Sequence, residues 1–206
     1  TWSTSAILAF GSGSTVNATT APNGSVTADL LVENTASSTH TISQTASFTS
    51  GVSYTFSVWV KSFGRNIRLT LPAGGFTAAI SATFDTTTGN LNATANSPSS
   101  TSAVSFSDGW WRFSITATAT TTASAAVSIN LISGPNAVSY LGNGTSGNYL
   151  WGAQLEQSST VGEYIPTTST INSAPRFDHN PTTGESLGLL VEEARTNLLL
   201  QSNGFD

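Results

Sequence analysis

An indole and a cation lie two residues apart in two segments of the chain: Trp59 with Lys61, and Trp110 with Arg112. Alternate residues of a β-strand point to the same face of a sheet, so each pair shares a face if its segment is a strand. An indole ring stacks on the apolar C–H face of a pyranose, and cations donate hydrogen bonds to sugar hydroxyls. If the two strands are neighbours, the four side chains form one surface suited to a glycan.

Two further polar residues extend this candidate site. Gln154 falls on the polar side of the last long alternating segment, and Tyr140 precedes the glycine-rich loop 142–147, which would form the rim of a cleft. The same pattern would arise if this face packed under a loop or against a neighbouring subunit. The expected glycan site comprises Trp59, Lys61, Trp110, Arg112, Gln154 and Tyr140.

The opposite faces of these segments are apolar and predict the hydrophobic core. In the last long segment, Tyr149, Trp151, Ala153 and Leu155 share one face by alternation, which places Trp151 in the core and not in a binding site. The expected core contains Tyr54, Phe56, Val58, Trp111, Phe113, Ile115 and Trp151.

Period-two alternation runs through most of the chain and predicts an all-β fold. Glycine, asparagine and aspartate separate the alternating segments at a spacing typical of an antiparallel β-sandwich of the jelly-roll type. We expect one such module over residues 1–170, with strands at 27–33, 39–49, 52–62, 66–71, 76–84, 103–107, 110–120, 125–132 and 148–156.

Composition narrows the classes of partner. The net charge is -5 and the six basic residues are scattered, so the chain lacks the basic stripe that nucleic-acid binding requires. No apolar run is long enough for membrane insertion. The absence of cysteine rules out disulfides and thiolate metal sites, and no acidic cluster marks a calcium site, so we expect no cofactor.

Catalytic motifs are also missing from the sequence. His40 and His179 are the only histidines, and we expect both to be surface residues, in a Ser/Thr-rich strand and in a turn respectively. Asp85, Asp108 and Glu156 are explained by turns or strand ends and not by a glycosidase pair. The chain is therefore not expected to be an enzyme.

Several motifs follow one another along nearly the whole chain: Ala21-Pro22-Asn23-Gly24, Tyr54-Thr55-Phe56-Ser57-Val58-Trp59-Val60-Lys61, Gly109-Trp110-Trp111-Arg112, Tyr149-Leu150-Trp151-Gly152-Ala153-Gln154-Leu155-Glu156, Pro175-Arg176-Phe177-Asp178 and Glu192-Glu193-Ala194-Arg195-Thr196-Asn197-Leu198-Leu199-Leu200. Together they resemble the fibre and head-spike proteins of phages and the sugar-binding-type jelly-roll module that those proteins carry. The chain departs from that pattern at Trp59 and Trp111, where Tyr would be expected, and at Asn23, where Asp would be expected.

Residues 171–206 are expected to form an extended connector arm that leads towards a further module or subunit. Pro175 and Pro181 interrupt ladder bonding, and the leucines 198–200 have no obvious place on a completed sandwich. We expect these leucines to dock on a neighbouring copy, which would give a homo-oligomer or a repeated module. A chain truncated at Thr170 should then stay folded but lose assembly.

The resemblance implies a structural protein of the virion surface: a fibre, spike or capsid decoration module, in contact with other virion proteins. It also implies weak, multivalent binding to host or environmental glycans. Two alternatives remain open at this point. One is a spacer or cement module without a ligand, and the other is a carbohydrate-binding module of a secreted enzyme.

Overall fold

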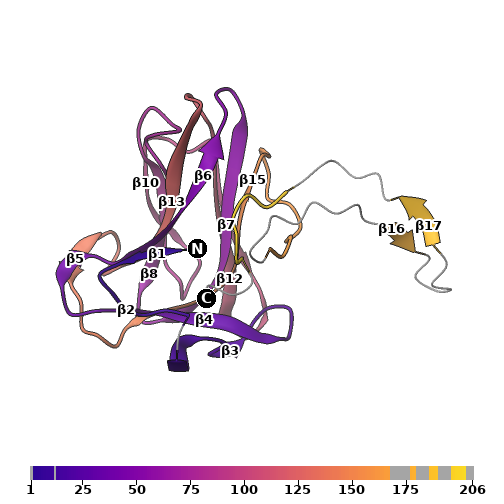
Figure 1. Ribbon diagram of the computed structural model, residues 1–206. Coiled ribbons are helices and arrows are strands. Elements are labelled where there is room, and N and C mark those ends of the chain that lie inside the picture. Colours follow the sequence, from indigo (N-terminus) through magenta and orange to yellow (C-terminus); the bar gives the residue numbers. More distant parts are fainter. Residues whose placement is uncertain (1, 12, 168–176, 180–185, 190–195, 203–206) are drawn as a thin grey trace.

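The computed structural model describes residues 2–11, 13–167, 177–179, 186–189 and 196–202. These residues form antiparallel sheets packed as a sandwich, with no α-helix among them, so the expected all-β sandwich is confirmed (Figure 1). Eight of the nine expected strands are present within a few residues of their expected bounds. The expected strand 39–49 is instead two elements, because the chain turns at His40.

Two large sheets face each other. The six-stranded sheet has the order β1 (Ser3–Ser5), β6 (Thr41–Phe48), β13 (Ala123–Ile132), β8 (Asn66–Leu71), β9 (Ile80–Phe84) and β10 (Leu91–Ala95). The seven-stranded sheet has the order β11 (Ser100–Ser105), β12 (Trp110–Thr118), β7 (Ser53–Phe63), β15 (Gly147–Glu156), β4 (Val26–Glu33) and β2 (Ile7–Ala9), with β3 (Thr19–Thr20) paired to β4.

Smaller elements complete the fold. Strands β5 (Ser37–Thr39) and β14 (Ser139–Leu141) form a two-stranded sheet, as do β16 (Phe177–His179) and β17 (Ser186–Leu189). Two short 3-10 helices are η1 (Gly13–Thr15) and η2 (Ser107–Gly109).

The main core lies between the two large sheets, and most of the residues expected in the core belong to it. Tyr54, Phe56, Val58, Phe113 and Ile115 are fully buried there, as expected from their alternation. Trp111 points to the same side and stacks at 6.2 Å on Phe113, but it lies at the margin of the core and is only partly buried.

A β-bulge in β15 moves Trp151 to the other face of its sheet. Trp151 pairs with Trp59 and Gln154 pairs with Ser57, so two residues of β15 oppose one residue of β7. Gly152, at φ +63, provides the left-handed conformation that such a bulge needs. The expectation that Trp151 shares a face with Ala153 was therefore wrong: Trp151 is buried, but in a second cluster on the outer face.

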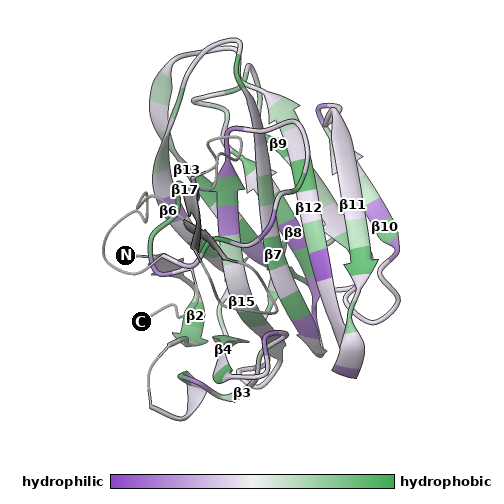
Figure 2. Ribbon diagram, turned by 90° about the vertical axis from the view of Figure 1, so that its right-hand side faces the viewer, coloured by the Kyte–Doolittle hydropathy of each residue, from purple (hydrophilic) through white to green (hydrophobic). Residues whose placement is uncertain are grey.

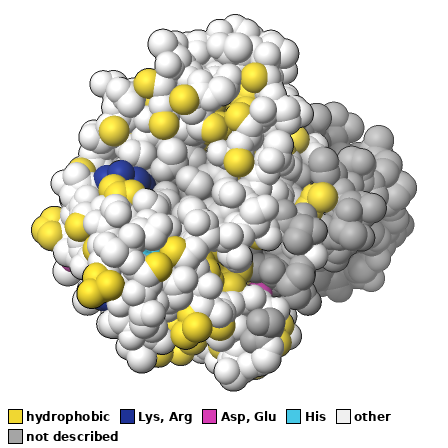
Figure 3. All heavy atoms as spheres, turned by 60° about the vertical axis from the view of Figure 1, so that its left-hand side comes forward, with side chains coloured by type: hydrophobic (Ala, Val, Ile, Leu, Met, Phe, Trp, Pro, Cys, Tyr) yellow, Lys and Arg dark blue, Asp and Glu magenta, His cyan; other side chains and the backbone are white. Residues whose placement is uncertain are grey.

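The outer face of the six-stranded sheet is rich in small hydroxyl side chains. Cross-strand register aligns one row of Ser3, Ser43, Ser128, Thr70 and Ser81, and a second row of Ser5, Thr41, Asn130, Arg68 and Thr83. Figure 3 views the molecule from this side, where most atoms are neither hydrophobic side chains nor charged. These two rows contain no aromatic ring.

The described parts of the predicted arm lie in two different places. The β16–β17 hairpin lies outside the sandwich (Figure 1). Residues 196–202, in contrast, pack into it: Leu199 is completely buried in the main core, and Leu198 packs against the same core. The expectation that the leucines 198–200 have no place on the sandwich was therefore wrong, and a chain truncated at Thr170 would lose part of its core.

The bulge predicts the outcome of a single substitution. A Cβ atom at Gly152 would lie 2.7 Å from the Trp59 ring, and the positive φ adds backbone strain. We expect Gly152→Ala to reduce the free energy of unfolding by about 2 to 4 kcal/mol in urea denaturation. Gly51→Ala is the control, because Gly51 has φ +82 but open space around it. Equal losses in both variants would contradict the packing role of Gly152.

Candidate functional site

Strand register brings the expected glycan residues together on the outer face of the seven-stranded sheet. Trp110 pairs with Lys61, and Arg112 pairs with Trp59, because β12 and β7 are antiparallel neighbours. Gln154 lies on the next strand, opposite Ser57. The face assignment made from alternation is thus correct for all five residues, and Figure 2 shows β11, β12, β7 and β15 side by side in this sheet.

The two indoles are nevertheless buried. Trp59 is 5% exposed and Trp110 is 2% exposed, and with Trp151 they form a second hydrophobic cluster outside the sandwich. Residues 19–25 and 157–167, which we call the cover, lie over this face. Trp110 Nε1 donates a hydrogen bond to the carbonyl of Thr20 at 3.2 Å. The ring centre of Tyr164 lies 5.4 Å from that of Trp59.

This cover decides between the alternatives that the sequence left open. The indole face was expected to be open to a glycan, or else packed under a loop or against a neighbouring subunit, and loops of the chain itself bury it. Alternation in a strand reports which residues share a face, and it carries no information about segments far away in the sequence. Trp59 and Trp110 therefore have a packing role in this structure.

Arg112 is held within the same cluster. Its guanidinium lies 4.0 Å from the Trp59 ring centre in a cation–π contact. Nη1 donates to the carbonyl of Gly162 at 2.8 Å, and Nη2 donates to Ser57 Oγ at 3.1 Å. Burial lowers the pKa of Arg112 to about 10, although the nearby Glu156 charge acts in the opposite direction. Arg112 thus binds the cover to the sheet.

Gln154 secures the cover at a second point. Its amide Nε2 donates to the carbonyl of Glu163 at 3.0 Å and to Glu156 Oε1 at 3.1 Å, while Oε1 accepts from Ile165 N at 2.8 Å. Glu156 Oε1 also accepts from Gly162 N at 2.8 Å. Since these contacts engage both ends of the Gln154 amide, the residue is a structural anchor in the described state.

Part of the outer face remains accessible beside the covered indoles. In the cross-strand row that contains Trp110 and Lys61, Tyr149 lies beside Lys61 and Phe106 lies beside Trp110. Phe106 is 44% exposed, and Phe63, which continues the alternation of Trp59 and Lys61, is 41% exposed. We call Phe63, Tyr149, Lys61 and Phe106 the aromatic rim. Alternation could have identified Phe63, whereas the exposure of Phe106 depends on the path of the cover.

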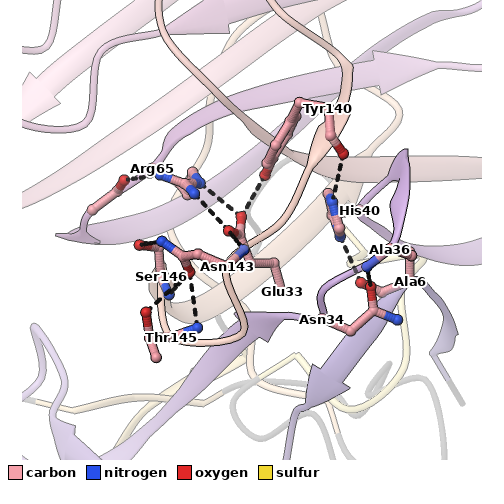
Figure 4. Close-up of polar contacts among 11 residues, drawn as sticks. Ala6, Glu33, Asn34, Ala36, His40, Arg65, Tyr140, Asn143, Thr145 and Ser146 are labelled. Carbon is pink, nitrogen blue, oxygen red and sulfur yellow. Dashed lines mark hydrogen bonds and ion pairs between the residues drawn. The ribbon is translucent and has the colours of Figure 1, made fainter.

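Tyr140 lies apart from this surface, in a polar cluster of loops shown in Figure 4. Its hydroxyl donates to Glu33 Oε2 at 2.7 Å. Arg65 donates to both Glu33 oxygens at 2.5 and 2.7 Å, and Asn143 N donates to Oε1 at 2.8 Å. One buried carboxylate at the end of β4 thus joins two segments that are distant in the sequence: the β7–β8 turn with Arg65, and residues 140–143. No sequence motif connects these residues, so this cluster was missed.

The contacts in this cluster determine the ionisation of Glu33. Burial on its own would raise the pKa of Glu33, but the hydrogen bonds from Arg65, Tyr140 and Asn143 N outweigh it, and the pKa lies below its usual value. Burial, followed by the hydrogen bond to Glu33, raises the pKa of the Tyr140 hydroxyl. At neutral pH the cluster is therefore a carboxylate with a neutral phenol and a guanidinium around it.

His40 is also part of this region, and its expected surface position was wrong. The side chain is fully buried, and its ring nitrogens lie 2.6 Å from the carbonyl of Ala6 and 3.3 Å from the carbonyl of Tyr140 (Figure 4). Gly142 packs directly against it, since an added Cβ would lie 2.8 Å from the His40 ring. His40 thus connects the β1–β2 turn to β14. His179 lies in β16, and its side chain is outside the described part of the structure.

Comparison with known proteins does not assign the chain to a family. No model of a protein family matches the chain, and no curated protein matches it in sequence. Within the described ranges, no three or more His, Asp or Glu side chains form a group that could hold a metal ion. No helix in the described portion of the chain is long and apolar enough to cross a membrane.

Substitution of Trp110 tests the packing role of the buried indoles. We expect Trp110→Ala to lower the free energy of unfolding by about 3 to 5 kcal/mol, because it empties the space between sheet and cover. Trp110→Phe should cost less, since it keeps a ring and loses mainly the hydrogen bond to Thr20. Chemical denaturation of the two variants measures both losses. A Trp110→Ala variant as stable as the unmodified chain would contradict the cover.

The Glu33 cluster predicts a pH dependence. A folded-state pKa below the unfolded value of about 4.5 adds stability at higher pH, and this stability is lost as the pH falls through the folded pKa. We expect Glu33→Gln to be less stable than the unmodified chain by about 2 to 3 kcal/mol at pH 7. In urea denaturation at pH 3 this difference should shrink. A difference that is the same at both pH values would show that Glu33 is not held as a carboxylate.

Proposed function

We propose that this chain is a non-catalytic β-sandwich module of a phage virion surface protein, and that it binds glycans weakly through the aromatic rim. The observation that carries the binding proposal is the exposure of Phe63 and Phe106 on the same face as the partly buried Tyr149 and Lys61, beside indoles that are covered. The motif resemblance and the sandwich fold support the assignment to a fibre, spike or capsid decoration.

The first part of the rim combines stacking surface with a donor. Phe63 and Tyr149 meet edge to face at 5.4 Å between ring centres. Lys61 lies in register with Tyr149 on one side and with Trp110 on the other, and it is only partly buried. An aromatic face beside an ammonium group provides the two contacts that a sugar ring needs, one apolar and one polar.

Phe106 extends this surface across the sheet. Its ring packs edge to face on Trp59 at 6.0 Å, and its amide donates to the carbonyl of Trp110. Trp59 thus supports the Phe106 ring, and Tyr149 supports the Phe63 ring. Because these contacts fix the rings before a ligand arrives, little side-chain entropy would be lost on binding.

The open shape of the rim predicts weak binding at each site. A shallow surface buries little of a sugar, so we expect dissociation constants of roughly micromolar to millimolar. Attachment would then depend on many copies that engage a polymeric glycan at once. The virion surface, where other virion proteins would present this module in several copies, provides such an arrangement.

A purely structural module is the second candidate, and one observation favours it. Arg112, Gln154 and Glu156, the polar residues that would orient a sugar, are instead engaged with the chain's own cover. In that case the same fold would be a spacer or cement between other virion proteins. A carbohydrate-binding module of a secreted enzyme would share the rim but would be followed by a catalytic domain.

The rim can be tested with variants that leave the core intact. The probes are a glycan array and a column of immobilised bacterial lipopolysaccharide, and the protein is tetramerised through a terminal biotin. We expect Phe63→Ala and Phe106→Ala to reduce retention at least about 10-fold with little change in melting temperature, because a stacked ring contributes about 1 kcal/mol or more per site. Leu91→Ala is the matched control: it removes a 48% exposed side chain from the other sheet.

Two results decide between the candidates. Loss of binding in the rim variants with retention in Leu91→Ala supports glycan binding at the rim. An array without signal for the unmodified tetramer, or equal retention of all variants, supports the structural module.

A further inference from the structure

The residues 196–202, which we call the C-terminal plug, close the sandwich between β15 and β6. Leu198 N donates to the carbonyl of Leu155 in β15 at 2.7 Å. On the other side, Leu200 N donates to Gln44 Oε1 in β6 at 2.7 Å, and Gln44 Nε2 donates back to the carbonyl of Leu200 at 3.2 Å. The plug therefore joins one strand from each large sheet.

Asn197 makes several hydrogen bonds that hold the plug to β15 and to the cover. It is fully buried, its Oδ1 accepts from Leu155 N at 3.1 Å, and its Nδ2 donates to the carbonyls of Ala153 and Ile165, both at 3.1 Å. Leu199 fills the core beside it. The contacts satisfy backbone groups of β15 that would otherwise be left unpaired in an apolar setting.

The side chains of the sandwich that contact the backbone of the C-terminal plug are polar. We call the space between β15 and β6 that the plug fills the groove. Gln44 is almost fully buried on the inner side of β6, and both ends of its amide bond to Leu200. Thr167 Oγ1 donates to the carbonyl of Leu199 at 2.6 Å, and Ser202 N donates to the carbonyl of Thr167 at 3.2 Å. Without the plug, buried amide and hydroxyl groups would lose their partners, so an empty groove is unfavourable.

A long stretch of chain separates the C-terminal plug from the rest of the sandwich in the sequence. Thr167 is the last residue of the sandwich and its cover that makes a described contact with the plug, and 28 residues, 168–195, lie between it and the plug in the sequence. Even if the residues 177–189 stay together as the β16–β17 hairpin, the rest can extend to about 50 Å. A sheet of six strands is only about 24 Å wide between its outer strands. The connection is thus long enough for the plug to reach the groove of a neighbouring copy.

We propose that the C-terminal plug is exchanged between copies of this chain, so that each sandwich in an assembly is completed by the plug of its neighbour. All contacts of Asn197, Leu199 and Leu200 are the same whether the plug comes from the same chain or from another. Exchange therefore changes only the entropy of the connection, and a high local concentration of copies favours it. The inference rests on the contacts of the plug and is independent of glycan binding.

The chain contains no cysteine, so introduced cysteines report exchange without background. The backbone hydrogen bond between Leu198 and Leu155 holds their Cα atoms within the distance that a disulfide spans. Full-length Leu155→Cys and Leu198→Cys chains, one of them with a size tag, are co-expressed and oxidised. The control pair is Ser47→Cys with Leu198→Cys, because Ser47 is an exposed residue of β6 without a contact to the plug in the described structure.

We expect a disulfide-linked heterodimer at a yield at least about 10-fold above the control pair. The double variant Leu155→Cys/Leu198→Cys on one chain should then form covalent dimers or larger species on a non-reducing gel. A heterodimer yield equal to the control overturns the proposal, as does a double variant that runs as a disulfide-closed monomer. Sedimentation of the unmodified chain as a monomer at the same concentration also overturns it.

Discussion

The packing of three indoles on the outer face of the seven-stranded sheet is the constraint on which the rest of the structure depends. Trp59, Trp110 and Trp151 come from three adjacent strands and have to be removed from water. The chain achieves this with its own cover, which buries much of β7, β12 and β15 on both faces. The central strands of this sheet thus lie between two cores: one shared with the six-stranded sheet, the other with the cover.

The bulge at Gly152 makes the second core possible. Without the extra residue, Trp151 and Leu155 would lie on one face, as simple alternation implies, and one of them would be misplaced. The bulge directs Trp151 to the cover and keeps Ala153 and Leu155 in the main core. The polar residues Arg112, Gln154 and Glu156 then bind the cover through its backbone. Residues that resemble a sugar-binding set are explained by this packing.

Prediction from the sequence succeeded where local alternation determines the answer. It identified the sandwich, eight of its strands and the face shared by Trp59, Lys61, Trp110 and Arg112. It failed where the answer depends on contacts between distant segments. Examples are the identity of the segments that cover Trp110, the buried position of His40 and the return of Leu199 to the core. The Trp151 error is of a third kind, since a single bulge residue reverses the alternation that follows it.

The central claim is that the outer indoles are interior groups of the folded chain, buried by its own cover. Hydrogen exchange of the indole N–H groups by NMR measures this directly, with each signal assigned through a Trp→Phe variant. Trp110 Nε1 donates to the carbonyl of Thr20 and Trp151 Nε1 donates to Thr27 Oγ1, so both should exchange only when the cover or the whole domain opens. Exchange of the Trp110 and Trp151 indoles at the rate of a solvent-exposed indole would contradict the account.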